Sequence, residues 1–313
     1  DRDAVALVAR LPGLAFEAAR RGLEQGPVLV QVPRKGYLPM IACADCRELA
    51  RCPACGWAMS MPGPGLPVQC PNCGPQAVPW SCTECGGTRV RAVRVGSGRT
   101  VAELTAAFPR VPVLRSDSNV GILAEAPSHA ALVVATPGAE PAAAGGYAAA
   151  LLLDGDVLLA APRLRAAEDA LARWTSAAAA VRTEGTVLVV ADPGAPAVQT
   201  LVRADPIGWA QRELVQRAEA GLPPAVRMVA LEGPAGAVAQ VRAALAERRP
   251  DAPAALGPFE LPGESAGRAE RWLLRMSYAQ TPGILDVVAE VQRERSRTKA
   301  PVVTVRVDPA DLQ

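Results

Sequence analysis

The sequence predicts an α/β fold: a parallel sheet with helices on it, a cysteine-rich insert, and a smaller α+β domain that follows. Three observations predict this. Short apolar runs alternate with helical patterns from residue 12 to residue 191, at connections typical of a parallel sheet. All 8 cysteines of the 313 residues lie between Cys43 and Cys85. Beyond Gly221-Leu222-Pro223-Pro224 the order of the elements changes.

The first part of the chain contains three helical patterns, and each is separated from the next by apolar runs that end at turn residues. Helices are predicted at residues 12–24 and 101–108, and residues 162–180 form an Ala-rich helix. Short apolar runs of this kind are typical of buried strands. The predicted strands are residues 27–32, 111–114, 131–135, 149–153 and 186–191.

The last part of the chain reads strand, helix, strand, helix, strand, which predicts a small α+β domain with its helices against one face of a sheet. Its predicted elements are residues 226–231, 235–247, 272–276, 281–294 and 302–307. The predicted domains are residues 1–42 with 93–220, the insert 43–92, and residues 221–313.

The composition limits the function classes. The net charge is +2, which gives no strong global field and leaves nucleic-acid binding to local patches. No apolar run reaches the ~20 residues that a membrane span needs, so no membrane partner is expected. The chain begins with Asp1 rather than Met, so we expect it to be part of a longer protein.

The cysteines form four Cys-x-x-Cys pairs, a spacing that lets two sulfurs reach one ion from a single tight turn. The pairs are Cys43/Cys46, Cys52/Cys55, Cys70/Cys73 and Cys82/Cys85. Gly56, Gly74 and Gly86 follow three of them, and glycine permits the positive φ of such a turn. Four thiolates close a tetrahedral structural zinc site. Eight thiolates therefore predict two zinc ions.

Other uses of these cysteines fit less well. Disulfides at this density are usual in small secreted domains, whereas these cysteines occupy one segment of a long chain without a secretory signal. An iron–sulfur cluster needs comparable ligands, but Pro53 and Pro71 inside pairs that glycine follows are more typical of zinc knuckles. A redox Cys-x-x-Cys usually stands alone beside a βαβ unit.

The four pairs can share two ions in three ways. We expect a nested arrangement, because Cys52/Cys55 and Cys70/Cys73 share the sequence Cys-Pro-x-Cys-Gly with a loop between them, as in a zinc ribbon. Cys43/Cys46 and Cys82/Cys85 would then close the other site at the neck of the insert. Sequential and interleaved pairings stay open.

Several segments together resemble the PriA family, the replication restart primosome proteins also called primosomal protein N′. The resemblance covers nearly the whole chain, and the spacing of the four cysteine pairs is its most specific part. The other matching segments are Arg34-Lys35-Gly36-Tyr37, Gly96-Ser97-Gly98-Arg99-Thr100, Val113-Leu114-Arg115-Ser116-Asp117, Gly221-Leu222-Pro223-Pro224, Leu256-Gly257-Pro258, Arg268–Leu274 and Val307-Asp308-Pro309.

The resemblance implies a RecA-like second helicase lobe with an inserted two-zinc ribbon module, followed by the family's C-terminal domain. It places the family's fork-binding domain and ATP-binding first lobe outside this chain. Partners implied by the resemblance are forked and single-stranded DNA, single-stranded DNA-binding protein, other primosome proteins and the replicative helicase. The resemblance also implies a bacterial cytoplasmic protein that associates with the nucleoid.

Two segments depart from the family pattern of the second lobe. The family's Gly-Thr-Gln-Met-x-x-Lys-Gly segment corresponds to 135–141 here, and its Gln-Val-Ala-Gly-Arg-Ala-Gly-Arg segment corresponds approximately to 175–182. Losing arginines that neutralise a transferring phosphoryl group removes ~10³-fold or more in rate. We therefore expect that ATPase and helicase activity have been lost and that no catalytic residue remains.

Two other functions compete with that of a PriA-like protein without helicase activity. An active ATP-dependent 3′–5′ helicase would carry a Gly-Lys-Thr phosphate loop upstream of this chain. A zinc-dependent chaperone would repeat Cys-x-x-Cys-x-Gly-x-Gly, whose second glycine is absent here.

Candidate contacts with DNA or partner proteins combine cations with aromatic rings. They are Arg34, Lys35, Tyr37, Arg268, Arg271 and Trp272. A solvated strand end or a wet strand face explains the same residues about equally well. Trp57 and Trp80 lie inside the insert, where packing over the zinc knuckles is favoured over base stacking.

Overall fold

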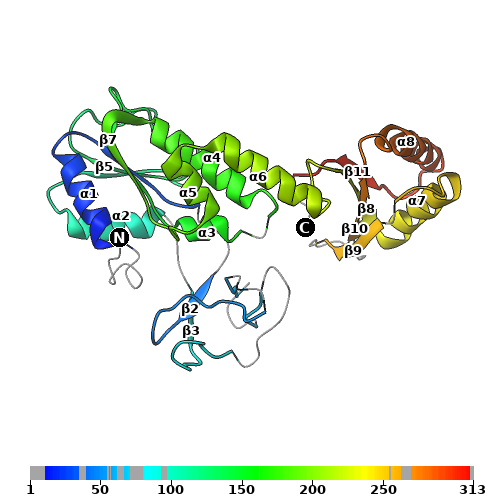
Figure 1. Cartoon of the computed structure of the whole chain (residues 1–313), viewed down its shortest axis with the longest axis horizontal. Helices are drawn as coiled ribbons and strands as arrows, with labels where there is room; N and C mark the ends of the chain where they lie inside the picture. The colour runs from blue at the N-terminus through cyan, green and yellow to red at the C-terminus, as the bar shows by residue number, and fades with distance from the viewer. Residues whose placement is uncertain are drawn as a thin grey trace. The chain divides into compact units, whose positions relative to one another are not determined.

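The chain is described by a computed structural model (Figure 1), and residues outside the following ranges are not described. The described residues are 11–34, 40–54, 56, 58–61, 67–70, 80–92, 97–161, 163–253, 255–261 and 269–310. The chain divides into two compact units, Asp1–Asp205 and Pro206–Gln313, which are taken in turn below.

The first unit is built on a five-stranded parallel sheet in the order β4-β5-β1-β6-β7. The strands are β1 (Val28–Gln31), β4 (Val113–Ser116), β5 (Leu132–Ala135), β6 (Tyr147–Leu152) and β7 (Val181–Val189). The three central strands are buried along their whole length. They are apolar throughout because helices cover both faces of a parallel sheet.

Helices from different parts of the chain cover the two faces of this sheet. On one face, α1 (Gly13–Leu23) and α2 (Ser97–Ala107) pack on side chains such as Val30 and Val134. On the other face lie α3 (Gly155–Leu159), α4 (Ala166–Ala179) and α5 (Pro196–Arg203). The alanine-rich composition of α1 and α4 lets their backbones lie close to the sheet, since an alanine contributes one methyl group to the contact.

The insert leaves the sheet after β1 and returns before α2 (Figure 1). Its neck is the antiparallel pair β2 (Ile41–Cys43) and β3 (Val90–Ala92), in which Cys43 stands opposite Val90. Isolated bridges continue the pairing inside the insert, between Ser60 and Gln69 among others. A small apolar cluster of Met40 and Ala58 with Val157 of α3 joins the insert to the first unit's helices.

The second unit is a four-stranded antiparallel sheet in the order β11-β8-β10-β9. It begins with α6 (Pro206–Glu219) and continues as β8 (Arg227–Pro234), α7 (Ala235–Arg248), β9 (Ala255–Glu260), β10 (Ala269–Met276), α8 (Thr281–Arg297) and β11 (Thr304–Val307). After α6, this βαββαβ order is that of a ferredoxin-like unit. Helices α7 and α8 pack on one face of the sheet, over Val229, Leu231 and Leu274.

The predicted α/β class is confirmed, as are the parallel sheet of the first unit and the α+β character of the second. The predicted domain boundaries stay a prediction, and the break between units falls at residues 205/206, ahead of α6. Strand β4 lies two residues later than the predicted strand 111–114, and β7 begins at Val181 rather than Thr186.

Six elements were not predicted: α3, α5, α6, β2, β3 and β9. Helix α3 is too short for helical periodicity to show. The strand β9 contains Gly257 and Pro258, which usually argue against a strand. It forms because β9 is an edge strand, where a proline need not donate a ladder hydrogen bond.

Among the described residues, every helix is too short or too polar to cross a lipid bilayer.

Candidate metal centre

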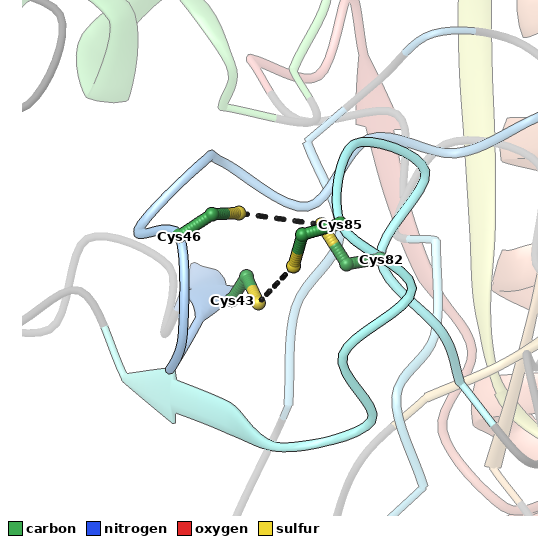
Figure 2. A group of neighbouring side chains, drawn as sticks. All are labelled: Cys43, Cys46, Cys82 and Cys85. Atoms are coloured by element: carbon green, nitrogen blue, oxygen red, sulfur yellow. Dashed lines mark hydrogen bonds between the residues drawn. The ribbon is translucent and has the colours of Figure 1, made fainter.

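The structure brings the sulfurs of the two outer cysteine pairs together at the neck of the insert. The Sγ atoms of Cys43, Cys46, Cys82 and Cys85 all lie within 4.8 Å of one another. Cys43 is 3.5 Å from Cys85, and Cys46 is 3.5 Å from Cys82 (Figure 2). A tetrahedral zinc with Zn–S bonds of ~2.3 Å separates its sulfurs by ~3.8 Å, whereas a disulfide bond measures ~2.0 Å. The four sulfurs therefore fit a thiolate zinc site.

The chain turns in the same way after Cys52 and after Cys82. The N–H of Gly86 donates to the carbonyl of Cys82 over 2.9 Å, and the N–H of Gly56 donates to the carbonyl of Cys52 over 2.8 Å. Gly56 and Gly86 have φ near +70° (72° and 73°). Arg47, which follows the pair without a glycine, has φ 70°. The turn therefore sets the positive φ, and Arg47 adopts a conformation that costs a residue with a Cβ of order 1 kcal/mol.

The thiols at this site have opposite pKa shifts. The N–H of Cys46 lowers the pKa of the Cys43 thiol to about 7. The N–H of Glu48 lowers the pKa of Cys46, but burial and the sulfurs of Cys85, Cys82 and Cys43 outweigh it and raise that pKa to about 12. Negative charges accumulate unfavourably on crowded sulfurs, so a cation that binds all four would displace their remaining protons.

Side chains around the outer pairs support this geometry, and the cysteine spacing does not reveal them. Arg89, just before β3, forms an ion pair with Asp45, which lies inside the first Cys-x-x-Cys turn. The N–H of Asp45 points at Cys43 Sγ over 3.4 Å. A side chain at Gly87 would collide with the Asp45 carboxylate and stand 3.3 Å from Cys43 Sγ. The absence of a side chain at Gly87 therefore leaves room for the Asp45 carboxylate beside Cys43.

The inner pairs are described in part. Cys52 and Cys70 lie in the same buried cluster as Met59 and Trp80. The β-bridge between Ser60 and Gln69 joins the segment that follows Cys52 to the segment that precedes Cys70. Cys55 and Cys73, the other predicted ligands of the second ion, lie outside the described residues. Trp80 is 9% exposed, which confirms its predicted packing inside the insert. Trp57 lies outside the described residues.

The two segments that depart from the family pattern lie at opposite ends of the sheet. After β5, Glu140 accepts the Gly138 N–H over 2.8 Å and the Gln31 amide over 2.7 Å, at the carboxyl end of the strands. Thr175 to Ala180 belong to the end of α4 and its cap. Arg182 is the second residue of β7, at the amino end of the sheet, and donates to the carbonyl of Gln25 over 3.2 Å.

Comparison with known proteins gives the family. A model of the primosomal protein N C-terminal domain matches residues 218–310. The probable replication restart protein PriA of Mycobacterium tuberculosis (strain ATCC 25618 / H37Rv) is 45% identical over 333 residues, covering 99% of this chain and 50% of that protein. The corresponding protein of Mycobacterium leprae is 44% identical over 336 residues, again 50% of its length.

The chain is a PriA homologue. It spans about half the length of the mycobacterial relatives. A shorter match, 33% identical over 85 residues and 27% of this chain, links it to the replication restart protein PriA of Bacillus subtilis. The resemblance inferred from the cysteine pairs and their flanking motifs is thereby confirmed.

The remaining candidate residues of the PriA homologue fall in two places. Arg34 follows β1, is exposed, and donates to the carbonyl of Pro137 over 3.2 Å. Its neighbours Lys35 and Tyr37 lie outside the described residues, as does Arg268.

Arg271 and Trp272 lie next to each other on β10 and point to opposite faces of the sheet. Arg271 binds Glu232 over 2.8 Å, and its side chain is 12% exposed. Trp272 faces α7, donates to Glu270 over 2.9 Å, and stacks under the guanidinium of Arg242 at 3.3 Å. Successive side chains of a strand alternate between the two faces of a sheet, so these two predicted contact residues lie on different faces.

Proposed function

We propose that this chain is the part of a PriA-type replication restart protein that combines a degenerate second helicase lobe, a zinc insert and the C-terminal domain. The proposed domains are residues 1–42 with 93–220, residues 43–92 and residues 221–313. The single observation that carries the proposal is the 45% identity over 99% of the chain to a probable replication restart protein. The parallel sheet with helices on both faces supports a RecA-like lobe.

We propose two structural zinc ions, one held by the outer pairs and one by the inner pairs. The outer set is Cys43, Cys46, Cys82 and Cys85, and the inner set is Cys52, Cys55, Cys70 and Cys73. Support for the first is the four-sulfur cluster, and support for the second is the shared burial of Cys52 and Cys70. Four protein sulfurs leave no open position for substrate, so each ion would hold the fold rather than perform catalysis.

Zinc content tests the two-ion proposal. Native mass spectrometry of protein purified without chelator should show two zinc ions per chain. The Cys52→Ser variant should lose one ion and keep the other, and the Cys82→Ser variant should do the same. A wild-type chain that holds one ion, or that loses both on either substitution, would contradict the proposal of two separate zinc sites.

We propose that the protein binds forked and single-stranded DNA and recruits single-stranded DNA-binding protein, primosome proteins and the replicative helicase. Support comes from the relatives, which are named as replication restart proteins. Arg34, Lys35, Tyr37, Arg268, Arg271 and Trp272 are the proposed contact residues. Fluorescence anisotropy of the full-length protein should show tighter binding to a fork than to a duplex of the same length.

We propose further that the protein lacks ATPase and helicase activity. One support is Glu140, a carboxylate near the carboxyl ends of the strands, at a place where the family has a lysine-containing segment. The other is Arg182, which lies at the opposite end of the sheet. An anionic side chain in that position repels phosphate groups instead of neutralising them.

Steady-state ATP hydrolysis by the full-length protein tests this proposal, with and without forked DNA. We expect the rate to equal that of a buffer control in both cases. DNA-stimulated hydrolysis above the control would support the alternative, an active ATP-dependent 3′–5′ helicase whose ATP-binding lobe precedes this chain.

A further inference from the structure

The four cysteines of the outer pairs are unequally shielded from solvent. Cys43 is 0% exposed and Cys82 is 7% exposed, whereas Cys85 is an exposed residue. Cys46 lies between these extremes. The oxidation of a thiolate follows its exposure, so a reagent in solution meets Cys85 before the other three.

The chain around Cys85 leaves this cysteine uncovered. Glu84 and Gly86, the residues on either side of it, are both exposed. A Cβ added at Gly86 would meet nothing within 4 Å. Open space next to Cys85 therefore lets a small reagent approach its side chain from solvent.

Each of the four sulfurs has a close neighbour on the other Cys-x-x-Cys turn. Cys85 Sγ lies 3.5 Å from Cys43 Sγ, and Cys82 Sγ lies 3.5 Å from Cys46 Sγ (Figure 2). A disulfide bond measures ~2.0 Å, so each of these two pairs would have to approach by ~1.5 Å to form one. The exposed sulfur of Cys85 thus faces a buried partner on the opposite turn.

Backbone bonds hold the two turns side by side without the help of any sulfur. The N–H of Ala44 donates to the carbonyl of Arg89 over 2.9 Å, and Cys43 stands opposite Val90 in the β2–β3 ladder. These bonds do not depend on a bound ion. Cys43 therefore stays close to Cys85 when the metal leaves.

The described cysteines of the inner pairs differ from Cys85. Cys52 and Cys70 are each 2% exposed, and both lie in the buried cluster with Met59 and Trp80. A reagent in solution has less access to these two cysteines than to Cys85. The outer set is therefore the one that a dissolved oxidant attacks first.

We propose that Cys85 is a peroxide-reactive site, whose oxidation joins it to Cys43 in a disulfide bond and releases the zinc ion of the outer pairs. This inference rests on the proposed zinc ion of that set, because a thiol that binds zinc is deprotonated and the thiolate is the nucleophile. The co-reactant is a hydroperoxide, with hydrogen peroxide as the probe.

The reaction is a two-electron oxidation of two thiolates. The Cys85 thiolate attacks one oxygen of hydrogen peroxide, so an S–O bond forms, the O–O bond breaks and hydroxide leaves. The Cys43 thiolate then attacks the Cys85 sulfur, so an S–S bond forms, the S–O bond breaks and a second hydroxide leaves. The two sulfurs together lose two electrons, and the peroxide gains them.

The outer set then retains only the thiolates of Cys46 and Cys82. Two thiolates are too few to close a tetrahedral site of four sulfurs, so the ion is released. The Cys43–Cys85 disulfide replaces it as the link between the two turns.

The position of Cys43 makes this oxidation reversible. A sulfenic acid without a thiol nearby is oxidised further to sulfinic acid, which thiols do not reduce. Cys43, held 3.5 Å away, traps the sulfenic acid of Cys85 within the same molecule. A disulfide formed in this way is open to reduction.

Peroxide treatment of the full-length protein tests the proposal. Native mass spectrometry should show that one zinc ion is lost while the other is retained, and peptide mapping should find Cys43 joined to Cys85. Treatment with a phosphine reductant and zinc should restore the lost ion. Retention of both ions in peroxide would overturn the proposal. A Cys82–Cys85 disulfide or a sulfinic acid at Cys85 would overturn the role of Cys43.

Two matched variants separate the outer set from the inner set. Cys52→Ser should keep only the outer ion and lose it to peroxide as fast as the wild type loses its first ion. Cys82→Ser should keep only the inner ion and retain it over the same period. Faster loss from Cys82→Ser than from Cys52→Ser would overturn the assignment of the reactive site to the outer set.

The wild-type protein gives the same information if either variant does not fold. Alkylation of the thiols that remain after increasing times in peroxide shows which cysteines have been oxidised. The outer four should be oxidised before the inner four, and the reverse order would overturn the proposal.

The zinc content before treatment separates this proposal from the proposed function. If the untreated protein holds no zinc on the outer pairs, the proposed zinc site and the peroxide reaction fail together. If the untreated protein holds two ions and keeps both in peroxide, the peroxide reaction alone fails and the proposed zinc sites survive.

Discussion

The insert and the parallel sheet that carries it hold their folds by different means. The sheet buries two layers of apolar side chains, with Leu29, Leu132 and Trp174 among those fully buried. The described part of the insert has two short strands and one small cluster in which four of the buried members are cysteines. A module this small needs a staple such as metal, whereas the sheet is stable through burial alone. Metal loss and core mutation should therefore affect different parts of the same chain.

The largest expected effect is the removal of a ligand from the four-sulfur cluster. Cys82→Ala should abolish metal binding at the neck of the insert, because structural zinc sites contribute ~10 kcal/mol or more of folding free energy. Limited proteolysis should then cut the insert while the first unit's sheet stays intact. Simultaneous cleavage of both would contradict the independence of the two regions.

The converse experiment removes a core side chain of the sheet. Trp174 is fully buried between α4 and the strands. Trp174→Ala should lower the free energy of unfolding of the first unit by ~3–5 kcal/mol, because it leaves a large cavity. Chemical denaturation measures the loss, and zinc content measured on the folded variant should stay at the wild-type value.

A smaller effect is expected from the buried carboxylate at the end of β4. Burial alone would raise the pKa of Asp117, but bonds from Ser97, the Asn119 N–H and Arg115 lower it from 3.8 to about 2. Because the pKa of Asp117 is lower in the folded chain than in the unfolded chain, its ionised carboxylate stabilises the fold above pH ~4. This contribution is lost as the pH falls toward ~2.

Asp117→Asn tests that linkage. The variant should be less stable than the wild type by about 2 kcal/mol at neutral pH, and the difference should shrink between pH 4 and pH 2. Thermal melts across this range measure it. Glu184→Gln, on β7, removes an exposed carboxylate from the same unit and serves as the control for the loss of one negative charge. A constant difference between wild type and Asp117→Asn would contradict the assignment.

The smallest effect is expected beside the metal site. The Arg89 side chain is 78% exposed in its ion pair with Asp45. Exposed pairs contribute little, so Arg89→Gln should change the free energy of unfolding by less than ~1 kcal/mol and leave the zinc content unchanged. Metal loss in this variant, measured by native mass spectrometry, would show that Arg89 holds the Cys43–Cys46 turn in place.

Local patterns predicted most of the helices and strands, because periodicity and turn residues act over a few neighbouring positions. Helix α7 and strand β1 lie within two residues of their predicted bounds. The prediction failed where a long-range contact decides the outcome. Pro258 sits in a strand because that strand is at an edge, and β7 extends back to Val181 because β6 offers a partner from Tyr147 onward.

The cysteine spacing by itself predicted metal binding in the insert, since two sulfurs in one tight turn are a local property. The family resemblance was also carried by short motifs, and the comparisons confirm it. The sequence favoured the nested pairing but left two other pairings open, and the tertiary structure brings Cys43 to Cys85, 42 positions away, and Cys46 to Cys82. It likewise decided that Arg271 and Trp272 face opposite ways and that Phe259 lies beside Arg271. Such neighbours are set by strand register and chain return, which a linear pattern does not encode.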